Sequence, residues 1–219
     1  MQAISARPCL MVRDFLGSVE RLAWARANGC PWEARMLGII AQHGNLAVLQ
    51  WAREHDCPWD LWTCARAAFG GHLAVLQWAR DHGCPWDART CRFAAEGGHL
   101  EVLQWAREYG CMWDATTCMF AASHGHLAVL KWARERGCPW TSTTCEYAAY
   151  GGHLHVLKWA REHGCAWDEQ TCNITVRHLA RPGRMEVLRW AREHGAPWDA
   201  ATRDLAATEG YTDYLPLSP

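Results

Sequence analysis

The sequence of 219 residues has almost no net charge and no long apolar segment. Lysine and arginine total 22, and aspartate and glutamate total 23, so the formal net charge is −1 at pH 7. Without an excess of one sign, no global field attracts nucleic acid or anionic lipid. No apolar run approaches the roughly 18 residues that a membrane span requires, and residues 1–8 lack the apolar segment of a secretory signal. We therefore expect a cytoplasmic protein that binds neither nucleic acid nor a membrane.

The chain also has little unrepeated sequence. The segment Gly97–Asp114, GGHLEVLQWAREYGCMWD, has close copies that begin at Gly70, His124 and Gly151. One tryptophan column recurs every 27 residues at Trp24, Trp51, Trp78, Trp105, Trp132 and Trp159, and Trp190 follows after 31. A second tryptophan lies eight places beyond each of these seven. Such a period indicates an array of stacked units.

Each copy predicts two short helices. The second helix, such as Leu100–Tyr109, carries apolar residues at helical spacing. Gly110 then follows as a C-terminal cap, and Asp56 replaces this glycine in one copy. The first helix of each pair begins at an Asp-x-x-Thr whose carboxylate can accept the free amides of the first turn, and it breaks at Gly-Gly-His. The sequence therefore predicts an all-α fold.

We expect residues 1–219 to form a single array of about seven helix-turn-helix pairs and a partial C-terminal unit. The N-terminal capping unit is predicted at about 1–29, where Arg21 occupies a position that is valine in other copies. A polar substitution there suits a unit with a neighbour on one side only. The C-terminal capping unit is predicted at about 199–219. Four additional residues between Cys172 and Arg184 predict one longer turn.

The repeated residues resemble ankyrin repeats. The family pattern A-A-x-x-G-H-x-x-V is matched by Ala94-Ala95, Gly98-His99 and Val102, and Gly110-Cys111 stands at the end of the pattern. The period is shorter than the family norm of about 33 residues. The missing residues fall where ankyrin repeats carry a β-hairpin finger, so the resemblance implies an ankyrin-like solenoid that lacks long fingers. The tryptophan- and cysteine-rich form resembles repeat proteins of giant DNA viruses and protists. For a viral chain, the expected location is the host cytoplasm.

Eleven of the twelve cysteines occupy two repeat columns, one beginning at Cys30 and the other at Cys64. Because buried cysteine behaves as a small apolar residue, we interpret both columns as reduced core thiols. A metal-binding alternative uses His82, Cys84 and Cys91 as soft ligands in one copy. Structural zinc needs four ligands, and other copies replace the histidine. We therefore expect neither a metal nor a cofactor. A redox or metal-binding role for the cysteines remains an alternative function.

We assign structural roles, and not ligand-binding roles, to the tryptophan columns and to the histidine column. Both tryptophan columns persist in all seven copies, which favours a core position; Trp62 lies outside both. The Gly-His histidines, with Asn45 in the same place in one copy, are predicted to bond to turn backbone. These residues are His72, His99, His126 and His153.

The first helix of each pair varies most between copies, at positions spaced i, i+3 and i+7 on one helical face. The candidate partner-binding residues at these positions are Trp62, Phe69, Arg89, Arg92, Glu96, Thr116, Met119, Thr143, Glu146, Tyr150, Gln170, Asn173 and Arg177. Stacked faces of this kind line the inner, concave surface that solenoids use for recognition. Aromatic residues and arginine are also enriched in binding hot spots.

We therefore predict a monomeric scaffold that binds another protein. Every candidate cysteine or histidine belongs to a repeat column, and no unrepeated cluster of nucleophile, base and acid is present. We expect no enzymatic activity. A purely architectural spacer is the remaining alternative.

Overall fold

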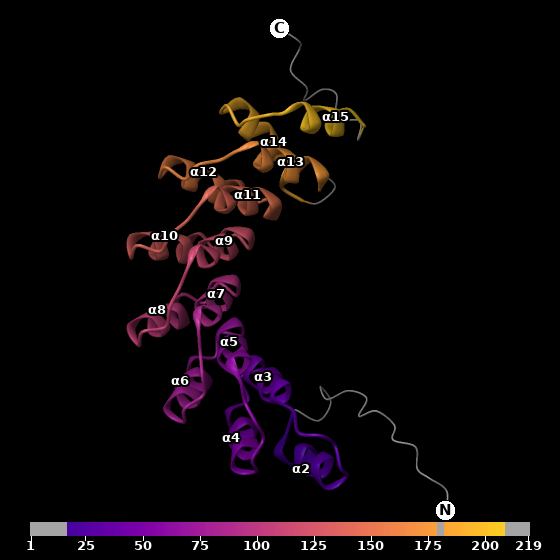
Figure 1. Cartoon of the computed structure of the whole chain (residues 1–219), viewed down its shortest axis with the longest axis vertical. Coiled ribbons are helices and arrows are strands. Elements are labelled where there is room, and N and C mark those ends of the chain that lie inside the picture. The colour runs from indigo at the N-terminus through magenta and orange to yellow at the C-terminus, as the bar shows by residue number, and fades with distance from the viewer. Residues whose placement is uncertain (1–16, 179–181, 209–219) are drawn as a thin grey trace, which may run out of the picture. The chain divides into compact units, whose positions relative to one another are not determined.

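The computed structural model describes residues 17–178 and 182–208, which form fourteen helices and no strand (Figure 1). Within these residues, no helix is both long and apolar enough to cross a membrane. Parts of both predicted capping units, and most of the four-residue insertion, lie outside the described ranges. Contacts divide the chain into two compact units, which are described separately. The single array over 1–219 therefore stays a prediction.

The first unit contains the described residues up to Ala94 together with Glu101–Cys111. Its helices are α2 (Val19–Ala27), α3 (Ala34–Gln42), α4 (Leu46–Glu54), α5 (Leu61–Phe69), α6 (Leu73–Asp81), and most of α7 (Ala88–Glu96) and α8 (Leu100–Glu108). Helix α3 packs beside α5, and α3 and α5 also pack against the helices that follow them, α4 and α6. The expected pairing of helices into antiparallel hairpins is therefore present.

The second unit contains Ala95–Leu100 and the described residues from Met112 onward. Its helices are α9 (Ala115–Ser123), α10 (Leu127–Glu135), α11 (Ser142–Gly151), α12 (Leu154–Glu162), α13 (Glu169–Arg177), α14 (Arg184–Glu193) and α15 (Ala200–Thr208). The first helices pack in sequence order, α9 on α11, α11 on α13 and α13 on α15. Each unit is thus a row of stacked hairpins, which confirms the all-α solenoid predicted from the repeat.

The core of both units consists of small and aliphatic side chains rather than indoles. Leu76, Leu103 and Leu130 are fully buried, and so are the alanine pairs and the cysteines of the first helices. The tryptophans of both columns are only half-buried in the described copies, and Trp24 is 57% exposed. The indoles therefore lie at the margin of the core, and Trp167 and Trp198 pack against it, so the prediction that the indoles form the core holds only in part. Alanine and cysteine bring the helices too close together to leave room for an indole between them.

The indoles instead pair between the loop that follows one second helix and the next second helix. Five pairs have ring centroids 5.8–6.0 Å apart at 61–69°, an edge-to-face geometry that aromatic rings favour. An arginine of the preceding second helix covers the ring, as Arg53 covers Trp59 at 4.0 Å and Arg134 covers Trp140 at 4.1 Å. The tryptophans therefore line the outer side of the helix-helix contacts.

The helix ends follow the predicted capping pattern. The Asp60, Asp114 and Asp168 carboxylates accept the amide of the residue two places further on. The glycine after each second helix is left-handed, and Asp56 adopts the same conformation at φ 64°. The next residue returns its amide to the helix, as Cys57 donates to the Ala52 carbonyl at 2.9 Å. This bond closes the C-terminal turn and directs the chain outward.

The Gly-His histidines join adjacent repeats. Nε2 of His72 donates to the Gln42 carbonyl, and Nε2 of His126 donates to the Glu96 carbonyl, each at 3.0 Å and across 30 residues. Asn45 donates to the Gly17 carbonyl at 3.2 Å in the equivalent place. Arg184 stands there after the insertion and donates to the Tyr150 carbonyl. The prediction that these histidines bond to backbone is confirmed for His72 and His126.

A glycine in the turn of the preceding repeat makes this contact possible. A Cβ at Gly44 would lie 2.4 Å from the His72 ring, and a Cβ at Gly98 would lie 2.6 Å from the His126 ring. Both glycines are left-handed, at φ +75° and +78°. They therefore serve the turn and the approach of the next repeat at once.

Gly98→Ala and Gly137→Ala form a matched pair that separates these two roles. Both residues are left-handed, but a Cβ at Gly137 meets nothing within 4 Å. We expect Gly137→Ala to cost about 1–2 kcal/mol from backbone strain alone. Gly98→Ala should cost about 1–3 kcal/mol more, because it displaces the His126 ring. Equilibrium urea unfolding measures both, and equal losses would contradict the close approach.

A column of buried threonines stands one residue before the cysteines of the first helices, and Thr202 continues it before Arg203. Thr63, Thr90, Thr117, Thr144, Thr171 and Thr202 are fully buried, and none of their hydroxyls has a hydrogen-bond partner among the described residues. Burying a hydroxyl without a partner costs free energy. At these positions the threonine methyl and its shape stabilise the packing, and the hydroxyl adds nothing.

Thr117→Val is therefore expected to leave stability unchanged or raise it by up to about 1 kcal/mol. Thr175→Val is the control, because the Thr175 hydroxyl is also buried but donates to the Thr171 carbonyl at 2.6 Å. That variant should lose about 1 kcal/mol. Thermal and urea unfolding compare the stability of the two variants. A larger loss of stability in Thr117→Val than in Thr175→Val would show that the Thr117 hydroxyl has a hydrogen-bond partner.

Candidate functional site

The predicted partner-binding residues have different degrees of exposure. Trp62, Gln170 and Arg177 are exposed, with Trp62 at 38%. Asn173 is buried at 9% and accepts a hydrogen bond from Nε of Arg177 at 2.7 Å. The remaining members are half-buried: Phe69, Arg89, Arg92, Glu96, Thr116, Met119, Thr143, Glu146 and Tyr150. Asn173 therefore supports Arg177 and contributes little surface of its own.

In the first unit, the structure brings the residues of α5 and α7 into one cluster around Phe93. The Phe93 ring lies 5.7 Å from Trp62 and 5.9 Å from Phe69, at 77° and 82°. The Arg92 guanidinium lies 4.7 Å from the Phe93 centroid, and the Arg89 guanidinium lies 5.1 Å from Trp62. We call Trp62, Phe69, Arg89, Arg92 and Phe93 the aromatic-arginine cluster. Two arginines and three rings at one place offer both charge and apolar area.

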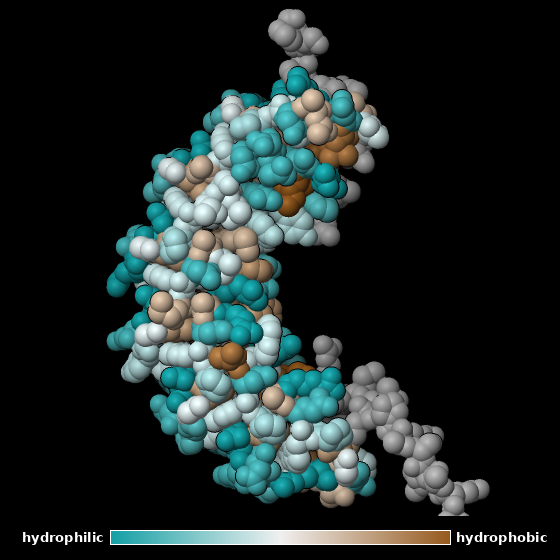
Figure 2. Space-filling view, in the orientation of Figure 1, coloured by the Kyte–Doolittle hydropathy of each residue, from teal (hydrophilic) through white to brown (hydrophobic). Residues whose placement is uncertain are grey.

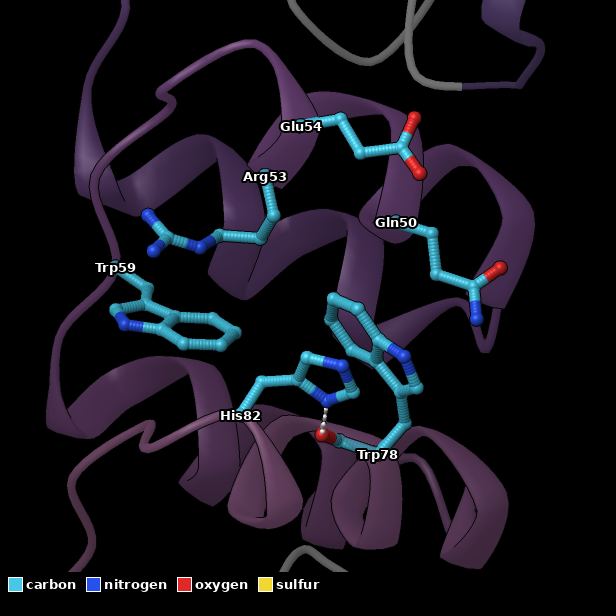
Figure 3. Close-up of a pocket in the computed structure, with 6 residues that line it drawn as sticks. All are labelled: Gln50, Arg53, Glu54, Trp59, Trp78 and His82. Atoms are coloured by element: carbon cyan, nitrogen blue, oxygen red, sulfur yellow. Dashed lines mark hydrogen bonds between the residues drawn. The ribbon is translucent and has the colours of Figure 1, made fainter.

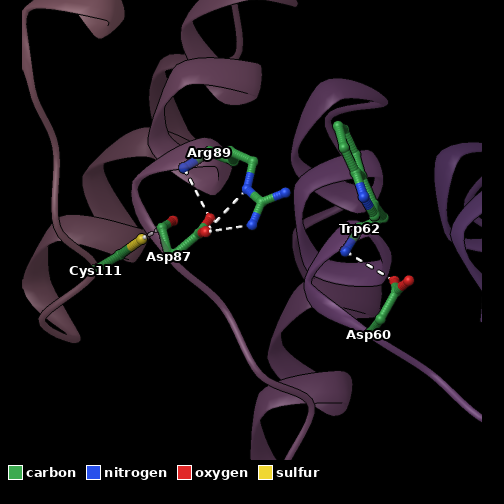
Figure 4. Close-up of polar contacts among 5 residues, drawn as sticks. All are labelled: Asp60, Trp62, Asp87, Arg89 and Cys111. Carbon is green, nitrogen blue, oxygen red and sulfur yellow. Dashed lines mark hydrogen bonds and ion pairs between the residues drawn. The ribbon is translucent and has the colours of Figure 1, made fainter.

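Short polar contacts position the cluster (Figure 4). Nε and an Nη atom of Arg89 donate to one Asp87 carboxylate oxygen at 2.9 and 2.8 Å, and the other oxygen caps the Arg89 amide at 3.0 Å. The hydrogen bond that Arg89 donates to Asp87 raises the pKa of Arg89 above its ordinary value. The Asp60 carboxylate accepts the Trp62 amide at 2.9 Å. The caps that begin α5 and α7 thereby also fix the first residues of the face.

The buried thiol of Cys111 reinforces this arrangement from the next copy. Its Sγ donates to the Asp87 carbonyl at 3.2 Å, and the Cys111 carbonyl accepts from the Cys91 thiol at 3.9 Å. Both cysteines are essentially inaccessible. The cysteine columns therefore hold the start of each first helix against the following repeat.

In the second unit, Tyr150 on α11 lies among Tyr147, His178 and Arg184, none of which is a predicted partner-binding residue. Its ring lies 6.0 Å from Tyr147 and meets the His178 ring edge-on at 5.3 Å. The Arg184 guanidinium lies 4.9 Å above it. Thr143 and Gln170 stand at helix starts, where the Thr143 hydroxyl hydrogen-bonds with that of Thr141 at 2.7 Å and the Gln170 amide donates to the Asp168 carboxylate at 3.1 Å. This second group again combines aromatic rings with an arginine.

Sequence reasoning missed Phe93, Phe120 and Tyr147, which form an aromatic column one position beyond the i+3 residues. All three are half-buried. Positions i+3 and i+4 share a helix face, so the signal was present in the sequence. The emphasis on the most variable positions excluded a column that stays aromatic in three successive copies.

Glu146 on α11 lies in an environment that disfavours its charge. Partial burial and the nearby Asp168 carboxylate, in that order, raise the pKa of Glu146 above its ordinary value. A carboxyl with a raised folded-state pKa binds more protons in the folded than in the unfolded state over the interval between the two pKa values. Its contribution to stability therefore falls as the pH rises through that interval.

Glu146→Gln should accordingly raise the melting temperature at pH 7, because the variant carries no charge to bury. The difference from the parent chain should vanish below about pH 4, where the carboxyl is protonated in both states. Melting curves between pH 3 and pH 8, followed by circular dichroism, measure this. A variant less stable than the parent at pH 7 would contradict the assignment.

The cysteines do not gather as the metal-binding alternative requires. The Cys84 thiol donates to the Asp60 carbonyl at 3.6 Å, and the Cys64 thiol approaches the Cys84 carbonyl at 4.0 Å, so Cys84 faces the preceding copy rather than Cys91. His82 stacks on Trp78 at 4.2 Å. Within the described ranges, no three histidine, cysteine or acidic side chains could hold a metal ion together.

Ten of the described cysteines are free and buried, as predicted for core thiols. Burial raises the pKa of the Cys57 and Cys172 thiols to about 12. Thiols of this kind are poor nucleophiles near neutral pH. Cys30 is disulfide-bonded and departs from the predicted pattern.

No protein-family model matches the chain, and no curated protein matches its sequence. Among solved structures, the ankyrin repeat domain of human ASB11 is similar, with a TM-score of 0.55 over 78% of this chain and 96% of the solved chain. Only 14% of the residues are identical, so the likeness concerns the fold alone. The fold is an ankyrin-like solenoid of helical hairpins, and the likeness to giant-virus and protist proteins stays a prediction.

Proposed function

We propose that the chain is an interaction scaffold whose first helices bind another protein, without performing chemistry. The single observation that carries the proposal is the aromatic-arginine cluster on α5 and α7. Trp62 is exposed there, and Phe69, Arg89, Arg92 and Phe93 are each half-buried. Tryptophan and arginine are the residue types most enriched at protein-binding hot spots.

The composition of the surface in view also suits a protein partner. In the view of Figure 2, small apolar groups are separated by hydrophilic side chains. Protein interfaces typically bury a few aromatic residues at their centre and have a polar, solvent-accessible rim. Asp87 pre-positions Arg89 at 2.8–2.9 Å, so less side-chain entropy is lost on binding.

The constant columns support the same division of roles. Cysteines, alanines, leucines and Gly-His residues pack one repeat on the next. The residues that differ between copies fall on the first helices, where Trp62, Arg89, Glu146 and Tyr150 give each copy a different chemistry. A row of unlike side chains can recognise one partner specifically. We also infer that the chain is a monomer in the cytoplasm. We infer no binding to nucleic acid or to a membrane, because a net charge of −1 gives no general attraction to either.

The test compares two triple variants by quantitative affinity capture and mass spectrometry from cells that express the chain. Trp62→Ala/Arg89→Ala/Arg92→Ala removes the cluster and should lower capture of the specific partner at least about tenfold. Glu101→Ala/Glu162→Ala/Glu193→Ala changes exposed residues of second helices and should leave capture intact.

Both triple variants must retain the melting curve of the parent, which excludes unfolding as the cause of a loss. Equal partner recovery by the cluster variant and the parent would refute binding through the first helices. Loss of capture by both variants would show that the interface also covers the second helices, which would contradict binding through the first helices alone.

A further inference from the structure

A groove lined by tryptophan lies between the second helices α4 and α6, away from the aromatic-arginine cluster. Its volume is about 460 Å³, and it is lined by Gln50, Arg53, Glu54, Trp59, Trp78 and His82 (Figure 3). Trp59 and Trp78 meet edge to face at 6.0 Å. His82 stacks on Trp78 at 4.2 Å, and its Nδ1 donates to the Trp78 carbonyl at 2.8 Å. These contacts fix the walls of the groove.

The second unit repeats the groove between α10 and α12, with one change. That groove has a volume of about 400 Å³ and is lined by Lys131, Arg134, Glu135, Trp140, Trp159 and His163. Lys131 stands at the place of Gln50, and its Nζ lies 6.0 Å from the Trp159 ring centroid. In the next copy, Lys158 Nζ lies 5.8 Å from Trp190. Both distances are within the range of cation–π attraction.

The chain itself thus shows which group this kind of groove accepts. In the second unit a lysine ammonium lies over the indole, in a groove that also holds an arginine and a glutamate. The α4–α6 groove keeps the glutamate and the indole but has the neutral Gln50 in place of the lysine. Arg53 does not fill that place, because its guanidinium covers Trp59 at 4.0 Å and donates to the Cys57 carbonyl at 2.6 Å.

The neighbouring groove between α6 and α8 is too small for the same role. It carries glutamine in the corresponding position, but Tyr109 replaces the histidine and stacks on Trp105 at 4.7 Å. The volume there is about 160 Å³. The α4–α6 groove therefore combines the Trp78 indole, with His82 stacked on one side of it, a carboxylate and space for an entering side chain.

We propose that the α4–α6 groove binds a lysine side chain of a partner protein, with the ammonium between the Trp78 indole and the Glu54 carboxylate. The partner's lysine takes the position that Lys131 takes in the second unit. The indole face attracts the ammonium through its quadrupole, and Glu54 supplies the opposite charge. This site is separate from the first-helix surface and adds a requirement for lysine to partner recognition.

The experiment follows the indole Nε1–H signals of the whole ¹⁵N-labelled chain by NMR. The probe is Nα-acetyl-lysine N-methylamide at low ionic strength, and its neutral counterpart is Nα-acetyl-norleucine N-methylamide. Trp78→Phe and Trp159→Phe variants assign the two signals. The lysine probe should shift the Trp78 signal saturably, and the norleucine probe should leave it in place.

Two variants that exchange the glutamine and the lysine of the two grooves serve as controls. Gln50→Lys supplies an internal ammonium and should weaken probe binding at Trp78 at least about fivefold. Lys131→Gln removes the internal ammonium and should create a response at Trp159 that the parent chain lacks. Glu54→Gln should weaken the response at Trp78 by a similar factor.

The proposal is overturned if the lysine probe leaves Trp78 unmoved, or if the norleucine probe shifts it equally. It is also overturned if Gln50→Lys binds the lysine probe as the parent chain does. Both exchanges replace side chains at the protein surface, and a melting curve equal to that of the parent confirms that each variant is folded.

Discussion

The close approach of each glycine turn to a histidine of the next repeat is the constraint on which this structure depends. Nε2 of His126 reaches the Glu96 carbonyl at 3.0 Å only because Gly98, lacking a Cβ, lets the ring lie against the turn. The bond uses a carbonyl at the end of a first helix, which has no helical partner of its own. Each contact therefore caps one helix and joins two repeats.

This constraint divides the surface of each hairpin between two tasks. Histidine, cysteine and alanine hold the first helices against one another, and Arg184 performs the histidine's task where the sequence departs from the pattern. The first helices keep one variable face, while the second helices present paired indoles and arginines that recur in every copy. A variable face suits recognition of one partner, and a recurrent groove suits recognition of one common side chain. The recurrent groove also varies between copies, with Gln50 in one and Lys131 in another, and with Tyr109 in place of the histidine in a third.

Much of the fold could be predicted because the repeat shows each local rule several times. The aspartate caps, the glycine after each second helix and the substitution by Asp56 all follow from backbone geometry. Contacts across 30 residues, such as His72 with Gln42, could not be predicted, because spacing shows a column but not what it touches.

The indoles were assigned to the core from their recurrence alone. Recurrence indicates that a residue contacts a neighbouring repeat. Whether an indole is buried also depends on how close to one another the alanines allow the helices to pack. Part of the aromatic-arginine cluster could be predicted, since variability pointed to Trp62 and Arg89 but not to Phe93, which lies between Trp62 and Phe69 in a column that stays aromatic in three copies.

Titration of the individual histidines by NMR tests the inter-repeat contact most directly. Burial lowers the pKa of His126 and His153, although a backbone hydrogen bond to each ring opposes the shift in part. The account predicts that these two rings titrate below the ordinary histidine pKa of about 6.5, with a protected Nε2–H in the neutral form. Titration of both rings at the ordinary value, with freely exchanging ring protons, would contradict the contact and the stacking that depends on it.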